Sequence, residues 1–147
     1  MAHVRTLVVW ESQVLLVQHH DRRDGLTFWL PPGGGSENGE TLEEAARREV
    51  KEETGVDVRV LRQVPVPPER DYLLFLAELV GAPEVTPEVE ECEHNIQAID
   101  AAWHSVTDAA PLGPMEPEYW AELAPLIRER LRDAPGDASQ REVDPRV

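Results

Sequence analysis

The chain has 147 residues, which is enough for one hydrophobic core and too few for two. Its formal net charge of −15 argues against nucleic acid or an anionic membrane as a partner, because either would need a basic face. No apolar stretch approaches membrane-spanning length, and the single cysteine, Cys92, cannot form an internal disulfide, so we expect a cytoplasmic protein.

Two runs rich in valine and leucine open the chain, at 3–10 and 13–18, and predict a hairpin of two core strands. A polar loop is expected at 19–25, where Arg22 and Arg23 could meet a phosphate or simply be solvated. The apolar segment that follows contains Trp29, which could stack on a nucleotide base. A position in the core or in a lid is the commoner role for such a tryptophan.

Residues 31–35 read Pro-Pro-Gly-Gly-Gly. Such a loop permits close contact, because the prolines fix its backbone and the glycines carry no side chains. Thr41 then predicts a helix N-cap, with Glu44 at the capping-box spacing, and Gly55 permits a left-handed end. A glycine-rich loop therefore leads into one short helix.

The last turn of this helix carries carboxylates where apolar residues are expected. At about 100° per residue, Glu49 and Glu53 lie on the arc that must face a core, and Glu52 lies beside it. Buried carboxylates raise one another's pKa or need a counter-charge, and they also face the unfavourable end of the helix dipole. A hard divalent cation such as Mg²⁺ would resolve both problems. The apolar members of the arc are Leu42, Ala45, Ala46 and Val50.

The spacing of these residues resembles the complete signature of the Nudix hydrolases. The signature begins at Gly34, and Glu40 follows after five intervening residues. After seven more residues come Arg48-Glu49-Val50, then Glu52-Glu53 and Gly55-Val56, each separated from the group before it by one residue. The signature covers 34–56, and a looser likeness of element order extends over about 4–131. Strands interleaved with helices predict an α/β fold with a mixed β-sheet between helices. The resemblance implies the same α/β/α sandwich.

The resemblance also implies hydrolysis of a pyrophosphate bond in a nucleoside diphosphate derivative, with Mg²⁺ as cofactor, for which Mn²⁺ could substitute. Carried over by position, Glu52 and Glu53 would be the principal metal ligands. Glu49 would be a further ligand or the base that activates water. A backbone oxygen of Gly33 or Gly34 could also reach a metal.

Arg48 would hold a glutamate of this cluster in place through a charge-assisted pair. The alternative is an arginine on the helix surface that pairs with Glu44, four residues earlier. Glu40 matches the acid at the loop-helix junction of the family, where it is more often structural.

After the helix, alternation over 56–66 predicts a strand broken by prolines, and 72–80 predicts a more continuously apolar strand. The loop at 81–95 carries acids that are usually solvated but could complete the metal or base constellation. These acids are Glu84, Glu88, Glu90, Glu91 and Glu93.

A further strand is expected at 96–103 and a turn or short helix at 106–112. An amphipathic helix is predicted at 116–132, and Pro125 inside it should kink or divide it. The composition of 133–147 predicts a disordered tail, which leaves 1–132 as the domain.

Tyr72 lies sixteen residues after Val56, a spacing that resembles the tyrosine of diadenosine polyphosphate hydrolases, although a core tyrosine would explain it equally well. The proline of the ADP-ribose pattern and the signature of NADH pyrophosphatases are both absent. We therefore expect a small-molecule nucleotide substrate, either a dinucleoside polyphosphate or a nucleoside triphosphate, with ADP-ribose or a nucleotide sugar as the alternative.

The competing class is a non-catalytic Nudix-like module that binds a nucleotide to regulate a partner. Such modules commonly lose metal glutamates, and here all three are present. The oligomeric state is left open, and a homodimer is compatible with the sequence.

Overall fold

The computed structural model describes residues 2–87, 95–106 and 117–132. Residues 107–112 of the expected turn and the tail at 133–147 lie outside this part of the chain. In chain order the elements are β1 (His3–Trp10), β2 (Gln13–Asp21), β3 (Thr27–Leu30), β4 (Gly33–Gly35), α1 (Leu42–Thr54), β5 (Val58–Val64), β6 (Leu73–Leu79), β7 (Ile96–Ser105) and α2 (Pro117–Arg132).

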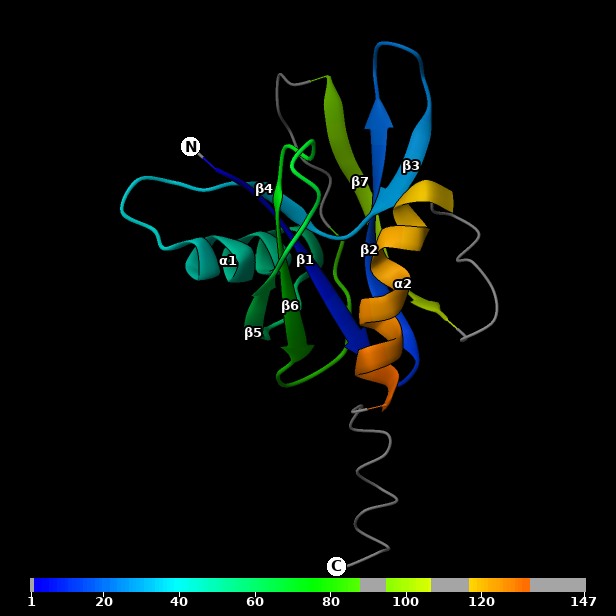
Figure 1. Ribbon diagram of the computed structural model, residues 1–147. Helices are drawn as coiled ribbons and strands as arrows, with labels where there is room; N and C mark the ends of the chain where they lie inside the picture. The colour runs from blue at the N-terminus through cyan, green and yellow to red at the C-terminus, as the bar shows by residue number, and fades with distance from the viewer. Residues whose placement is uncertain (1, 88–94, 107–116, 133–147) are drawn as a thin grey trace, which may run out of the picture.

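The strands form one mixed sheet in the order β3-β2-β1-β6-β5, with β4 paired to β1 and β7 paired to β2 (Figure 1). The β1–β6 pair is parallel and the other pairs are antiparallel. β1 pairs with β2 only at Val9 and Trp10, and with the glycine strand β4 at its opposite end. The glycine strand therefore lies against the middle of the sheet.

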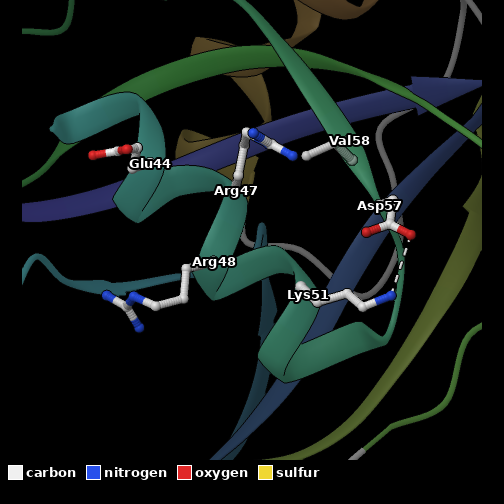
Figure 2. A pocket seen from close by; sticks show the side chains of 6 residues that line it. All are labelled: Glu44, Arg47, Arg48, Lys51, Asp57 and Val58. Carbon is white, nitrogen blue, oxygen red and sulfur yellow. Dashed lines mark hydrogen bonds and ion pairs between the residues drawn. The ribbon is translucent and has the colours of Figure 1, made fainter. Parts of the chain in front are cut away.

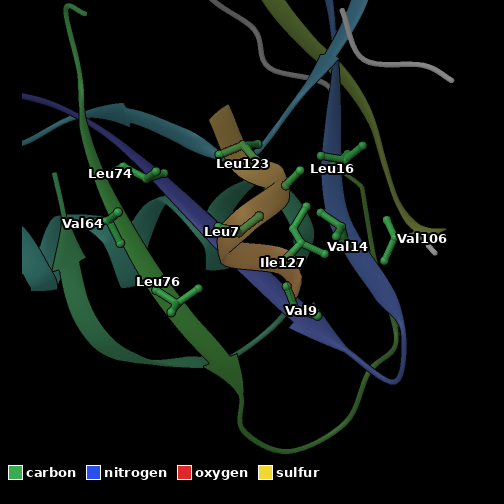
Figure 3. Packing of buried hydrophobic residues seen from close by; sticks show 11 residues of the cluster. Leu7, Val9, Val14, Leu16, Val64, Leu74, Leu76, Val106, Leu123 and Ile127 are labelled. Atoms are coloured by element: carbon green, nitrogen blue, oxygen red, sulfur yellow. The ribbon is translucent and has the colours of Figure 1, made fainter. Parts of the chain in front are cut away.

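The two helices cover opposite faces of the sheet. Alternate residues of a strand point to opposite faces. In β1, Val4 and Val8 pack in the clusters that contain the buried residues of α1, whereas Leu7 and Val9 pack with α2. Figure 3 shows Leu123 and Ile127 of α2, the latter beside Val9 and Val14. The expected α/β/α sandwich is confirmed.

One expectation about the elements is wrong, and another is tested only in part. β2 does not end at Gln18 but continues through Asp21, because His19 and His20 pair with β3 and β7, which outweighs their polarity. α2 is not divided at Pro125, and the alternative expectation of a kink stays a prediction. Leu123 and Ile127, buried on either side of this exposed proline, hold both halves of the helix on one core. Neither described helix has the length and apolar character needed to cross a bilayer.

Candidate active site

Two adjacent glycines of β4 allow close approach from two directions. Gly33 lies opposite Arg5 and Gly34 lies opposite Val4 in the β1–β4 pair. A Cβ atom at Gly33 would lie 2.1 Å from the Val4 carbonyl oxygen, and one at Gly34 would lie 2.3 Å from Glu49 Oε2. Both distances are shorter than van der Waals contact, so the backbone of β1 and the Glu49 carboxylate need glycine at these positions.

The ends of α1 are capped as expected. The Glu44 N–H donates to Thr41 Oγ1 over 3.1 Å, and the Thr41 N–H donates to Glu44 Oε1 over 2.7 Å, which completes a capping box. At the other end Gly55 adopts a left-handed φ of 78°, and its N–H donates to the Lys51 carbonyl. Because Glu44 is engaged in the cap, the alternative pairing with Arg48 is not formed.

The three carboxylates at the end of α1 differ in exposure. Glu53 is only 7% exposed, and its Oε1 accepts a 2.9 Å hydrogen bond from the Gly33 N–H. The Glu49 side chain is 12% exposed and lies against Gly34, whereas the Glu52 side chain is 57% exposed. Two carboxylates therefore face inward at the glycine strand, and the third lies at the rim.

Arg48 joins the loop before α1 to these carboxylates. Its Nη1 donates to Glu49 Oε2 over 3.2 Å and to Glu52 Oε1 over 3.1 Å. Its Nη2 donates to the Gly35 carbonyl over 2.9 Å and to Glu40. The hydrogen bond between Arg48 and Glu40 raises the pKa of the guanidinium and lowers the pKa of the carboxyl group. One arginine thus fixes two carboxylates relative to the glycine strand.

The donors at this site have the chemistry of a hard-cation site. Within the described residues, no group of three or more His, Cys, Asp and Glu side chains is arranged to hold a metal ion. Glu49, Glu52 and Glu53 nevertheless offer carboxylate oxygens at and beside the glycine strand, and oxygen is the donor that Mg²⁺ prefers. Their chemistry fits a divalent cation.

The described residues on either side of 88–94 form backbone hydrogen bonds with other elements. The Thr86 N–H donates to the carbonyl of Thr54, the last residue of α1, over 2.8 Å. At the other end the Arg22 N–H donates to the Asn95 carbonyl, also over 2.8 Å. Thr86 thus lies at the end of α1, and Asn95 lies at the β2–β3 turn. The acids Glu88, Glu90, Glu91 and Glu93, proposed to complete the constellation, lie outside the described residues.

The two aromatic residues proposed to bind substrate pack on the core cluster under α2. Trp29 is half-buried and meets His104 edge-on, with ring centroids 4.6 Å apart. The Tyr72 hydroxyl donates to Glu122 Oε1 over 3.4 Å. Both side chains therefore have structural contacts, and a role toward a nucleotide stays a prediction.

The two arginines proposed to meet a phosphate lie at the β2–β3 turn. Arg22 Nη2 donates to Gln97 Oε1 over 3.0 Å, and Arg23 forms a 2.8 Å ion pair with Asp21. This pair holds the pKa of the Asp21 carboxyl group well below its usual range. The role of these arginines toward a substrate stays a prediction as well.

Two residues that were not expected at a site lie near the glycine strand or beside one another: Arg5, expected as strand scaffold, and His19, expected in a polar loop. Arg5 Nη1 donates to the Pro31 carbonyl over 2.9 Å. His19 is buried and stacks on Phe28, and burial, with a smaller effect of Arg5, lowers its pKa to about 4. The available signal for Arg5 was a polar residue inside an otherwise apolar strand.

The fold is an α/β/α sandwich, and two carboxylates at the end of its capped helix lie against a glycine strand. This combination is typical of one family of hydrolases. The NUDIX domain model matches residues 2–129, so the chain belongs to the Nudix hydrolase family. The resemblance found in the sequence is thereby confirmed.

The proteins to which this chain is similar are named for different enzymes. The NAD-capped RNA hydrolase NudC of Vibrio parahaemolyticus is 35% identical over 127 residues, covering 84% of this chain and 45% of that protein. The human 8-oxo-dGDP phosphatase NUDT18 is 32% identical over 126 residues, covering 83% and 38%. An ADP-ribose pyrophosphatase structure from Streptococcus suis matches with a TM-score of 0.58 and 26% identity, covering 86% of this chain and 91% of that one. The chain spans less than half the length of the two curated relatives.

Proposed function

We propose that this chain hydrolyses a pyrophosphate bond in a nucleoside diphosphate derivative, with Mg²⁺ as its cofactor. The observation that carries the proposal is that Glu53 bonds to the Gly33 N–H and Glu49 lies against Gly34, while Arg48 binds both Glu49 and Glu52. The names of the relatives support the same class of substrate, since NAD, 8-oxo-dGDP and ADP-ribose all contain linked phosphates.

In this proposal Glu52 and Glu53 would hold the cation together with the Gly34 carbonyl, and Mn²⁺ can replace Mg²⁺. When bound, the cation activates water and stabilises negative charge on phosphoryl oxygens. Glu49 is either a further ligand or the base that takes the proton of the attacking water. The Gly33 N–H orients the Glu53 carboxylate. Arg48 holds the carboxylates of Glu49 and Glu52 close together by donating a hydrogen bond to each.

Within this class we propose a dinucleoside polyphosphate or a nucleoside triphosphate, supported by the position of Tyr72. The second candidate is ADP-ribose or a nucleotide sugar, supported by the likeness to the Streptococcus suis pyrophosphatase. The net charge of −15 favours a free nucleotide over an RNA chain, and the single cysteine suits a cytoplasmic location.

The proposal is tested with diadenosine tetraphosphate, dGTP, ADP-ribose and NAD, each with and without Mg²⁺. The reaction is run in ¹⁸O-labelled water, and mass spectrometry of the products shows which phosphorus is attacked. We expect the wild type to hydrolyse at least one compound only with Mg²⁺, and Glu53→Gln to lose activity on the order of 100-fold.

Glu43→Gln is the matched control, because Glu43 lies exposed on the same helix away from the glycine strand, and it should keep full activity. Full activity of Glu53→Gln with Mg²⁺ would remove this carboxylate from the chemistry. A silent panel combined with tight nucleotide binding would favour the regulatory module instead.

A further inference from the structure

A groove separate from the glycine strand runs between α1 and β5. Its volume is about 620 Å³, and Val58, Val60 and Val80 give it an apolar surface. Val80 is 42% exposed, although it is a large hydrophobic residue. A smaller hollow of about 260 Å³ also borders α1 and shares Arg47, Asp57 and Val58 with the groove. The two hollows thus adjoin one another beside the helix.

Arg47 lines both hollows and is the one basic residue of α1 without a partner in the described part of the chain. Arg48 and Lys51 both form ion pairs with carboxylates, whereas Arg47 has no hydrogen bond or ion pair to any described residue. Figure 2 shows its side chain directed toward Val58, while Arg48 extends in another direction. This exposed guanidinium is therefore available for an anion from outside.

Arg47 belongs to a different side of the helix from the catalytic candidates. At about 100° per residue, it lies roughly 160° from Glu49 and roughly 120° from Glu53 around the axis. None of the three carboxylates of the candidate active site lines either hollow. A ligand in the groove would therefore not occupy the site proposed for hydrolysis.

The groove suits a compact ligand better than an added strand. β5 is the last strand of the sheet, so a peptide or a second copy could in principle pair with it. Its register shifts between Val60 and Arg62, and the charged side chains of Arg59 and Arg62 are exposed. An irregular, charged edge is the usual protection against strand addition. The volume of the groove lies within the range of about 300–1,000 Å³ typical of small-molecule sites.

The rim limits the charge of the ligand. Glu43, Asp57 and Arg59 also border the groove. Asp57 already forms an ion pair with Lys51, and Arg59 forms one with Glu78, so Arg47 is the available guanidinium. Two acids beside a single available guanidinium would repel a polyphosphate. One carboxylate, in contrast, matches the paired donors of an arginine.

We propose that this groove binds a small organic monocarboxylate, with its carboxylate on Arg47 and its apolar body on Val58, Val60 and Val80. The inference goes beyond the proposed hydrolysis and does not depend on it. It assigns a second ligand site to the helix that carries the catalytic candidates.

The test is a ¹⁵N NMR titration of the full chain with benzoate, phenylacetate and hexanoate, and with benzamide as the uncharged match of benzoate. We expect saturable shifts of the Val58, Val60 and Val80 amides with at least one carboxylate, and weaker binding of benzamide than of benzoate. Arg47→Gln should weaken carboxylate binding by about tenfold, and Arg47→Lys should weaken it less.

Arg132→Gln is the control, because it removes one exposed arginine from α2 instead, and it should leave the affinity unchanged. The dispersed spectrum of each variant shows that it is folded. The proposal is overturned if no carboxylate gives saturable shifts, if Arg47→Gln binds as tightly as the wild type, or if the shifts centre on Gly33–Gly35.

Discussion

Gly33 and Gly34 are neighbours in the chain, yet a methyl group at each would meet a different kind of obstacle. At Gly33 it would meet the Val4 carbonyl, which belongs to the backbone of the central strand. At Gly34 it would meet the Glu49 carboxylate, which is the end of a side chain. The first position therefore controls the sheet, and the second controls the candidate active site.

We predict that Gly33→Ala lowers the free energy of unfolding by roughly 3 kcal/mol, because overpacking against backbone cannot relax easily. Gly34→Ala should lower it by less than about 1 kcal/mol, because a carboxylate can turn aside, but hydrolysis should fall on the order of tenfold. Urea unfolding and hydrolysis rates of both variants check this contrast. Normal activity in Gly34→Ala would show that the position of the Glu49 carboxylate does not matter.

The buried imidazole of His19 makes stability depend on pH. Its folded pKa is about 4, below the usual value of 6.5, so the unfolded chain binds a proton more readily between these values. Stability from the neutral imidazole is therefore complete above pH 6.5 and is lost as the pH falls toward 4. The loss from this residue is up to roughly 3 kcal/mol.

We predict that His19→Gln flattens the pH dependence of the free energy of unfolding between about pH 4.5 and pH 6.5. Burial also lowers the pKa of His3 and His104, so a smaller slope of the same sign should remain in the variant. Urea unfolding at several pH values measures both slopes. Identical slopes in the two proteins would mean that His19 is not held neutral by the fold.

At the scale of elements, α1 could be predicted almost completely because its signals are local. Thr41 and Gly55 mark its ends, and the helical period alone places Glu49 and Glu53 inward. The end of β2 and the continuity of α2 could not be predicted in this way, because both depend on partners distant in the sequence. Pairing with β3 and β7 extends β2, and burial on the core carries α2 past Pro125.

Pro125 destabilises α2 even though the helix is continuous. It lacks an N–H group for the helical hydrogen bond and is disfavoured by about 3 kcal/mol relative to alanine in a helix interior. We predict that Pro125→Ala raises the free energy of unfolding by roughly 1–3 kcal/mol in urea.

Pro68→Ala is the matched control, since Pro68 is an exposed proline outside the helices. Losing this proline should bring no gain, because a loop proline mainly restricts the unfolded chain. If Pro125→Ala proved no more stable than Pro68→Ala, the helix would tolerate its proline without cost.

At the scale of the whole molecule, the candidate active site is a product of contacts between distant segments. Glu40, Arg48 and the three carboxylates of α1 could be found from their spacing, but their geometry could not. That geometry depends on the pairing of β4 with β1, which brings Gly33 to Glu53, and on the reach of Arg48 to the Gly35 carbonyl. Arg5 and His19 were missed because only the folded sheet brings them close together.

The net charge of the molecule opposes the binding of a polyphosphate, which the proposed cation would offset. With a formal charge of −15, the summed field repels a polyphosphate, and Arg48 is already shared among carboxylates. A divalent cation held by the end of α1 would reverse the sign of the local charge. Its binding is therefore the property on which the proposed function depends.

The most direct measurement is the affinity of Mn²⁺ for the full chain, followed by electron paramagnetic resonance, in the wild type, Glu53→Gln and Glu43→Gln. We predict saturable binding in the wild type and in Glu43→Gln, and affinity lower on the order of tenfold or more in Glu53→Gln, which lacks an inward carboxylate. Equal Mn²⁺ affinity in all three proteins would contradict a metal site at the end of α1.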